Sequence, residues 1–264
     1  MEKLFCLTLL VCLVAPFYGA PTTEETVTGN VEEHIVNGID AKYCEFPHVV
    51  FLRIAAKPND YFCGATLISD KYLLTAAHCL ERQISSIEAH FGSTNKMNAT
   101  VIVGVKSWLI HPQYTKSPGL RNDIAIMTLE KPVPKGKCVQ PIEIAKKDDQ
   151  FFSRCIAVGW GKTGENGHYP TQLQKASMYR MVHGQCKKFS RALPDMHLCM
   201  GDLQPHGENI CNGDSGTGLM CKRKTDSKYI LAGIASFGYN CDQGFGVFVR
   251  VKHFADFIKK HTNV

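Results

Sequence analysis

The amino-acid sequence predicts an all-β fold, a sandwich or a barrel, that is followed by one short helix. Short runs rich in β-branched and other apolar residues recur between turn signals, a spacing typical of sandwiches and barrels. The chain has 264 residues, 44% of them hydrophobic, which suffices for one large domain or two small ones with packed cores. The runs cover residues 48–54, 65–68, 101–103, 124–127, 156–158, 229–234 and 246–249.

The last predicted element lies close to the C-terminus. Val251, Phe254, Phe257 and Ile258 recur at helical spacing, and charged residues stand between them. This pattern predicts an amphipathic C-terminal helix. The rest of the mature chain contains neither an internal repeat nor a low-complexity tract.

The first twenty residues predict a secretory signal peptide. Lys3 precedes an apolar run over residues 4–15, and Gly19 and Ala20 follow it. A membrane anchor is the alternative, but the run is shorter than the ~20 apolar residues that span a bilayer. Residues 21–34 are acidic and contain almost nothing that packs in a core, so we expect a disordered prosegment.

The mature part of the chain is basic. The formal net charge is +6, and residues 1–34 carry one lysine against five glutamates, so the remainder carries +10. The clusters at residues 187–188, 222–224 and 259–260 are candidates for binding sulfated glycans, with solvated surface charge as the alternative. No motif supports nucleic-acid binding, and no membrane association is expected.

Three short motifs indicate nucleophilic catalysis. The segment Cys-Asn-Gly-Asp-Ser-Gly presents Ser215 on a glycine-flanked turn whose backbone N–H groups can face a developing oxyanion. His78 lies in Thr-Ala-Ala-His-Cys, and Asp123 begins Asp-Ile-Ala-Ile. The chain order His, Asp, Ser is one of three unrelated orders known for such triads. Each residue alone has a structural explanation, as a histidine beside a disulfide, a capping aspartate and a turn serine, but together they favour catalysis.

With these motifs, the chain resembles the chymotrypsin/trypsin family of secreted serine proteases from Ile35 to the C-terminal helix. The resemblance implies a protease domain over residues 35–264. Its expected architecture is two antiparallel Greek-key β-barrels, at about residues 35–140 and 141–250, with the active site between them.

The resemblance also implies the catalytic roles. Ser215 is the nucleophile and His78 is its general base, because a serine hydroxyl needs a neighbouring base to take its proton. Asp123 holds the tautomer of the imidazole and stabilises the imidazolium. The N–H groups of Gly213 and Ser215 form the expected oxyanion hole.

Activation is expected to follow a cut after His34. In the family that the chain resembles, the new ammonium, here that of Ile35, pairs with the buried Asp214 and orders the oxyanion loop. His34 stands where Lys or Arg is usual, which departs from trypsin-like activation.

The substrate pocket follows from the same resemblance. Asn209 takes the base of the pocket, where trypsin-like relatives have Asp, and a neutral amide does not offset the desolvation of a Lys or Arg side chain. We therefore expect cleavage after Phe, Tyr, Leu or Met. Asn209 can alternatively bind a polar group such as histidine, which makes His34 a possible self-cleavage site, and Asp242 can add an acidic charge from the side. The expected pocket residues are Asn209, Ile210, Asn212, Ser236, Phe237, Gly238 and Gly246.

Ten cysteines remain after the signal peptide, an even set that suits an oxidising compartment. Spacing alone does not assign their partners. The resemblance implies Cys63–Cys79, Cys155–Cys221, Cys186–Cys199 and Cys211–Cys241. Cys44 and Cys138 are left, and their pairing follows by elimination.

No cofactor or metal is expected. The chain has no C-x-x-C pair, and residues 92–100 lack the carboxylates that calcium-binding relatives place there. Asn98 begins the one acceptable N-glycosylation sequon, Asn-Ala-Thr.

The predicted function is a secreted serine endopeptidase made as a zymogen. Its expected partners are protein or peptide substrates and serine protease inhibitors. The alternative is a catalytically weak or inactive relative that binds polyanions or proteins. Thr217 and Gly218 keep this alternative open, because they replace the Gly-Pro that usually follows the Ser-Gly of the nucleophile turn.

Overall fold

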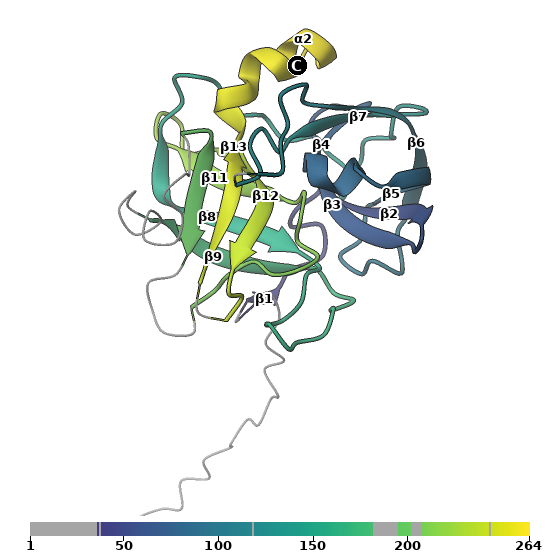
Figure 1. The fold of residues 1–264 in the computed structure, drawn as a ribbon. Helices are drawn as coiled ribbons and strands as arrows, with labels where there is room; N and C mark the ends of the chain where they lie inside the picture. The colour runs from purple at the N-terminus through teal and green to yellow at the C-terminus, as the bar shows by residue number, and fades with distance from the viewer. Residues whose placement is uncertain (1–35, 37, 118, 182–194, 202–206, 243) are drawn as a thin grey trace, which may run out of the picture. The chain divides into compact units, whose positions relative to one another are not determined.

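A computed structural model of the chain describes residues 36, 38–117, 119–181, 195–201, 207–242 and 244–264 (Figure 1). The signal peptide and prosegment expected over residues 1–34 lie outside these ranges. The description below concerns the described residues.

Six antiparallel strands form a first closed barrel, with neighbours in the order β2-β3-β4-β7-β6-β5. Strand β4 therefore pairs with β7 rather than with β5, which is the strand crossing of a Greek key. The strands are β2 (Val49–Lys57), β3 (Tyr61–Leu67), β4 (Tyr72–Thr75), β5 (Gln83–Phe91), β6 (Val101–Ile110) and β7 (Ala125–Leu129).

A second sheet runs in the order β1-β9-β10-β13-β12-β11-β8, and β8 also pairs with β9. This last pairing closes six of the strands into a second barrel, with β1 on its edge. The fold class predicted from the sequence is confirmed. The strands are β1 (Ile39–Asp40), β8 (Phe151–Gly159), β9 (Gln174–Arg180), β10 (His197–Gly201), β11 (Gly218–Arg223), β12 (Tyr229–Tyr239) and β13 (Phe245–Arg250).

Alternation along the strands explains the barrel core. In β2, Val50, Leu52 and Ile54 are fully buried, while Arg53 between them is exposed. A strand turns successive side chains to opposite faces, so one face of β2 fills the barrel and the other meets solvent. This burial stabilises each barrel by removing apolar surface from water.

The C-terminal helix is shorter than its sequence pattern indicates. Residues Val251–Phe254 form a 3₁₀ turn, η2, and the α-helix α2 covers Ala255–Thr262. Val251, Phe254 and Ile258 are all buried, so the apolar spacing reflects burial along both segments. A tighter turn at a helix start is common and keeps the same face inward.

Four disulfides join described residues. Cys63–Cys79 ties β3 to the 3₁₀ turn η1 (Ala77–Leu80), and Cys44–Cys138, Cys155–Cys221 and Cys211–Cys241 are also bonded. Cys199 is disulfide-bonded as well, and its expected partner Cys186 lies outside the described residues. Each cross-link limits the freedom of the unfolded chain.

We predict that His48 makes the stability of the fold sensitive to acid. Its side chain is buried, its Nε2 has no hydrogen-bond partner within the described ranges, and burial lowers its pKa from 6.5 to about 4. Between these pH values the unfolded chain binds a proton that the folded chain excludes, so the free energy of unfolding falls as the pH falls. The shift corresponds to about 3 kcal/mol in total.

We expect His48→Leu to remove this contribution. Urea unfolding of both proteins at pH 7.5 and pH 4 measures it: the stability of wild type relative to the variant should fall by about 3 kcal/mol on acidification. Parallel pH dependences of the two proteins would contradict a neutral buried imidazole.

Candidate active site

The three residues of the predicted triad come from three separate segments that the fold brings together. His78 lies in η1, directly after β4, and Asp123 lies just before β7. Antiparallel pairing places Thr75 opposite Ala125, so His78 and Asp123 project beyond the same end of this strand pair. Ser215 lies on the turn before β11 of the second barrel.

The side chain of Asp123 is fully buried and accepts three hydrogen bonds. One oxygen accepts the backbone N–H of His78 at 2.8 Å. The other lies 2.8 Å from Nδ1 of His78 and accepts the Ser236 hydroxyl at 2.5 Å. A carboxylate beside Nδ1 keeps the proton of a neutral imidazole on that nitrogen, which leaves Nε2 as a proton acceptor.

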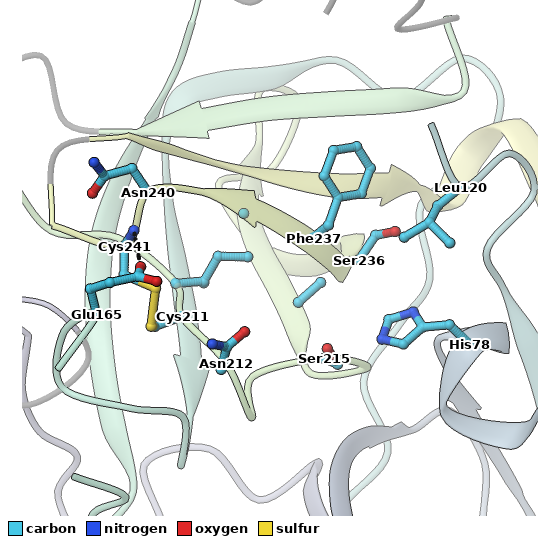
Figure 2. Close-up of a pocket in the computed structure, with 13 residues that line it drawn as sticks. His78, Leu120, Glu165, Cys211, Asn212, Ser215, Ser236, Phe237, Asn240 and Cys241 are labelled. Atoms are coloured by element: carbon cyan, nitrogen blue, oxygen red, sulfur yellow. Dashed lines mark hydrogen bonds between the residues drawn. A yellow bond between two sulfur atoms is a disulfide. The ribbon is translucent and has the colours of Figure 1, made fainter. Parts of the chain in front are cut away.

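Ser215 and His78 line one cavity of about 370 Å³. Figure 2 shows the imidazole of His78 turned toward Ser215 at one end of this cavity. The carbonyl of Ser215 accepts the N–H of Gly64 at 2.8 Å, and Gly216 donates its N–H to Ala235 at 2.8 Å. The nucleophile turn is thus hydrogen-bonded to strands of both barrels.

Two glycines are required by the turn. Gly216 has φ +85°, and a Cβ there would clash with the carbonyl of Gly64 and the hydroxyl of Thr75. Gly213 has φ +100°, a left-handed conformation that a side chain disfavours. The backbone N–H of the intervening Asp214 bonds to Cys211 at 3.1 Å, whereas those of Gly213 and Ser215 donate to no atom of the described residues. Both N–H groups flank the Ser215 side chain without an acceptor among the described residues, as the predicted oxyanion hole needs.

Asp214 is a fully buried carboxylate. Burial raises its pKa to about 7, although the N–H groups of Cys211 and Gly161 donate to it at 2.9 and 2.8 Å. It forms no ion pair with any residue that the structure describes. Val36 is buried against the Cys211–Cys241 disulfide, so the chain enters this region directly after Ile35. His34 and Ile35 themselves lie outside the described residues.

Thr217 and Gly218, which replace the Gly-Pro that is usual after the Ser-Gly of this turn, have structural roles. Thr217 is buried and donates its hydroxyl to the carbonyl of Asp214 at 2.7 Å. Its methyl group lies where a Cβ on Gly64 would be, and a Cβ on Gly218 would clash with Leu231 and Thr66. These residues therefore pack the turn against the barrels without entering the cavity.

Asn209 is buried directly beside the lining residue Ile210 and is not itself part of the cavity lining. Its side chain is buried, with Nδ2 donating to the carbonyl of Cys241 at 3.2 Å and Oδ1 accepting the N–H of Ile210 at 2.8 Å. The Asn209 side chain is thus hydrogen-bonded to the backbone beside the Cys211–Cys241 disulfide and does not line the cavity. Gly246 is likewise outside the lining, because it packs against Ile210. The other expected pocket residues do line the cavity: Ile210, Asn212, Ser236, Phe237 and Gly238.

The structure adds an acidic residue that sequence reasoning missed. Glu165 lines the cavity beside Cys241, at the end away from His78 (Figure 2), and accepts the N–H of Cys241 at 3.4 Å. Asp242, expected to bring an acidic charge to the pocket, instead accepts the N–H of Glu165 at 3.0 Å and does not line the cavity. Glu165 lies fifty residues before Ser215 in a polar loop, and no motif or periodicity marks it.

Asn98 is exposed on a turn in which its N–H bonds to the carbonyl of Asn95 at 3.0 Å. Across the described ranges, no three His, Cys, Asp or Glu side chains are close enough to hold a metal ion. No helix in those ranges is both long and apolar enough to cross a membrane.

Comparison of the sequence with known proteins identifies the family to which the chain belongs. The chain is 31% identical over 240 residues to the "Inactive CLIP domain-containing serine protease A28" of Anopheles gambiae, which covers 84% of this chain and 62% of that protein. It is 30% identical over 241 residues to "Ovochymase" of Halocynthia roretzi, covering 87% of this chain and 15% of that protein. The chain therefore spans less than two thirds of the length of either relative. The Trypsin family model matches residues 35–258, which include both barrels, and the chain belongs to the trypsin family.

Proposed function

We propose that this protein is a secreted serine endopeptidase, made as a zymogen, that hydrolyses peptide bonds through an acyl-enzyme. The observation that carries the proposal is that His78 lines one cavity with Ser215 while its Nδ1 lies 2.8 Å from the buried carboxylate of Asp123. Secretion is supported by the leader sequence and the disulfides. Protein substrates follow from the family, while protein inhibitors as partners and a glycan on the exposed Asn98 are further parts of the proposal.

The chemistry begins with attack of the Ser215 hydroxyl oxygen on the scissile carbonyl carbon. Nε2 of His78 takes the hydroxyl proton, while Asp123 keeps its bond to Nδ1 and stabilises the imidazolium. The negative charge that forms on the carbonyl oxygen is bound by the N–H groups of Gly213 and Ser215. His78 then protonates the leaving amine, and water releases the acyl group by the same steps in reverse.

Activation is proposed to depend on Asp214. Its buried carboxylate has a raised pKa and lies beside the segment that follows Ile35. A cut after His34 supplies an ammonium that can pair with this carboxylate, and a buried ion pair that loses one partner costs about 3–5 kcal/mol.

The processed protein should therefore hydrolyse peptides much faster than the uncut chain. We expect a ratio on the order of 10²–10⁴ in kcat/KM, the factor that corresponds to the loss of one buried ion pair. The measurement compares uncut protein with protein whose N-terminus is confirmed as Ile35. Equal activity of the two forms would reject the zymogen, and absence of activity from both would reject the protease.

A non-catalytic relative is the second candidate, because one of the similar proteins is named inactive. That candidate predicts a processed protein with Ile35 at its N-terminus that binds partners but turns over no peptide.

The primary specificity is proposed to favour large uncharged side chains. Ile210, Ala235, Phe237 and the Cys211–Cys241 disulfide contribute an apolar part to the lining of the cavity. Glu165 at its far end can accept a hydrogen bond from the tip of a tyrosine or a histidine, but a carboxylate there also pairs with the cation of Lys or Arg, so it is the feature that opposes this preference. A peptide library varied at the residue before the cut tests this: fastest turnover after Arg or Lys would contradict it.

Glu165→Gln should narrow the difference between tyrosine and phenylalanine substrates. The amide keeps an acceptor but loses the charge, so we expect the ratio of kcat/KM for Tyr over Phe peptides to fall about fivefold. Glu130→Gln, at the end of β7 outside the cavity, is the matched control and should leave the ratio unchanged. An unchanged ratio in the Glu165 variant would exclude a role for this carboxylate in specificity.

A further inference from the structure

A second groove, of about 680 Å³, shares no lining residue with the catalytic cavity. Its lining residues come from the loop that precedes β8, the end of β9, the residue two positions before β10, the end of β13, η2 and α2. Its lining is strongly charged and consists of Lys147, Arg180, Asp195, Arg250, Lys252, His253 and Asp256.

The positive charges of the groove outnumber the negative ones. Two lysines and two arginines line the groove together with two aspartates. Lys147 and Asp256 pair at 2.6 Å, and both side chains are mostly exposed, so this pair sits at the rim and neutralises itself. Asp195 alone then faces Arg180, Arg250 and Lys252.

Arg250 is a partly buried cation whose charge the protein leaves incompletely matched. One terminal nitrogen donates to the carbonyl of His197 at 2.9 Å, and Nε is buried without a hydrogen-bond partner among the described residues. Burial and the neighbouring Arg180 both lower the pKa of Arg250, against the opposite effect of Asp195. A bound anion would relieve this repulsion.

Lys252 is held in place before any ligand binds. Its ammonium donates to the carbonyl of Asp149 at 2.9 Å and lies 5.8 Å from the centre of the Phe151 ring. The remaining N–H bonds of the ammonium are available to an anion. A fixed cation loses less conformational freedom on binding than a free surface lysine.

The basic cluster at residues 222–224 is a weaker candidate than its sequence indicates. Arg223 pairs with Glu143 at 2.6 Å and Asp226 at 2.7 Å, and its side chain is only 11% exposed. The charge of Arg223 is therefore neutralised by ion pairs within the fold and is not available to a ligand. The cluster at residues 187–188 lies outside the described residues.

We propose that this groove binds a sulfated glycan, with Arg180, Arg250 and Lys252 contacting its sulfate groups. Guanidinium groups match the oxygens of such anions in a bidentate manner. The disulfides indicate an oxidising compartment, where sulfated glycans occur.

The test measures the Kd of the full-length protein for a fluorescent heparin octasaccharide at two salt concentrations. Arg180→Gln with Lys252→Gln should weaken binding roughly tenfold and reduce its salt dependence, because two charged contacts are lost. Lys222→Gln with Lys224→Gln removes the same formal charge elsewhere and should leave Kd within about twofold. Circular dichroism checks that each variant is folded, and the exposed Arg180→Gln alone should weaken binding if the pair does not fold.

Three results would overturn the proposal. Equal loss in both double variants would assign the binding to net charge rather than to this groove. Unchanged binding in the groove variants would place the ligand elsewhere. Tighter binding of a single-stranded DNA of matched charge would make the ligand a nucleic acid.

Discussion

Replacement of Ser215 by alanine should abolish almost all peptide hydrolysis by the processed protein. Loss of the nucleophile from a comparable triad lowers kcat by about 10⁶-fold, and the residual rate comes from the oxyanion site and binding. We expect a fall of at least about 10⁴-fold here, measured as kcat/KM on a peptide amide. The Ser215 hydroxyl makes no hydrogen bond with the described residues, so the variant should unfold at the same urea concentration as wild type.

A matched control separates catalysis from a general effect of serine removal. Ser107 is exposed on β6, outside the cavity, and Ser107→Ala should retain full activity. Hydrolysis that survives in Ser215→Ala at more than a few per cent would show that another group, or a contaminating protease, attacks the substrate.

The second large effect is expected from Asp123→Asn. An amide in place of the carboxylate can donate to Nδ1 of His78, which moves the imidazole proton to Nε2 and leaves no acceptor for the serine proton. We expect kcat to fall about 10⁴-fold at pH 7, with a much smaller change in KM. The measurement is a full kinetic comparison on one peptide substrate.

Ser236→Ala provides the comparison for this variant. It removes one hydrogen bond to Asp123 but keeps the carboxylate, so the loss in kcat should be far smaller. If Asp123→Asn and Ser236→Ala were equally impaired, the role of Asp123 would be structural support rather than control of the tautomer.

The strands and the three motifs could be recognised in the sequence because both depend on local patterns. Alternating apolar residues define strands such as β2. The motifs around His78 and Ser215 carry a cysteine or glycine signature, and Asp123 opens the short apolar run Asp-Ile-Ala-Ile. The family resemblance then supplied the two-barrel arrangement, which no periodicity alone specifies.

The pocket was harder to predict because its lining depends on where loops pack. Counting back from Ser215 predicted Asn209 at the base of the pocket. In the structure its side-chain amide is hydrogen-bonded to the backbone of Ile210 and Cys241. Glu165 reaches the cavity only because its loop folds against the Cys211–Cys241 region. The groove of Arg180 and Lys252 also joins segments far apart in the sequence.

Family membership does not by itself decide activity, since one similar protein is named inactive. The features that bear on activity in this chain are local. They are the hydrogen-bonded carboxylate of Asp123, the positive φ of Gly213, and the N–H groups of Gly213 and Ser215, which have no acceptor in the described part of the chain.

The most direct measurement of the central proposal is the mass of the processed protein after reaction with a peptidyl phosphonate, followed by peptide mapping. A working triad predicts one covalent adduct per molecule on the oxygen of Ser215, and none in Ser215→Ala. A processed protein with Ile35 at its N-terminus that forms no adduct would contradict the assignment as a protease.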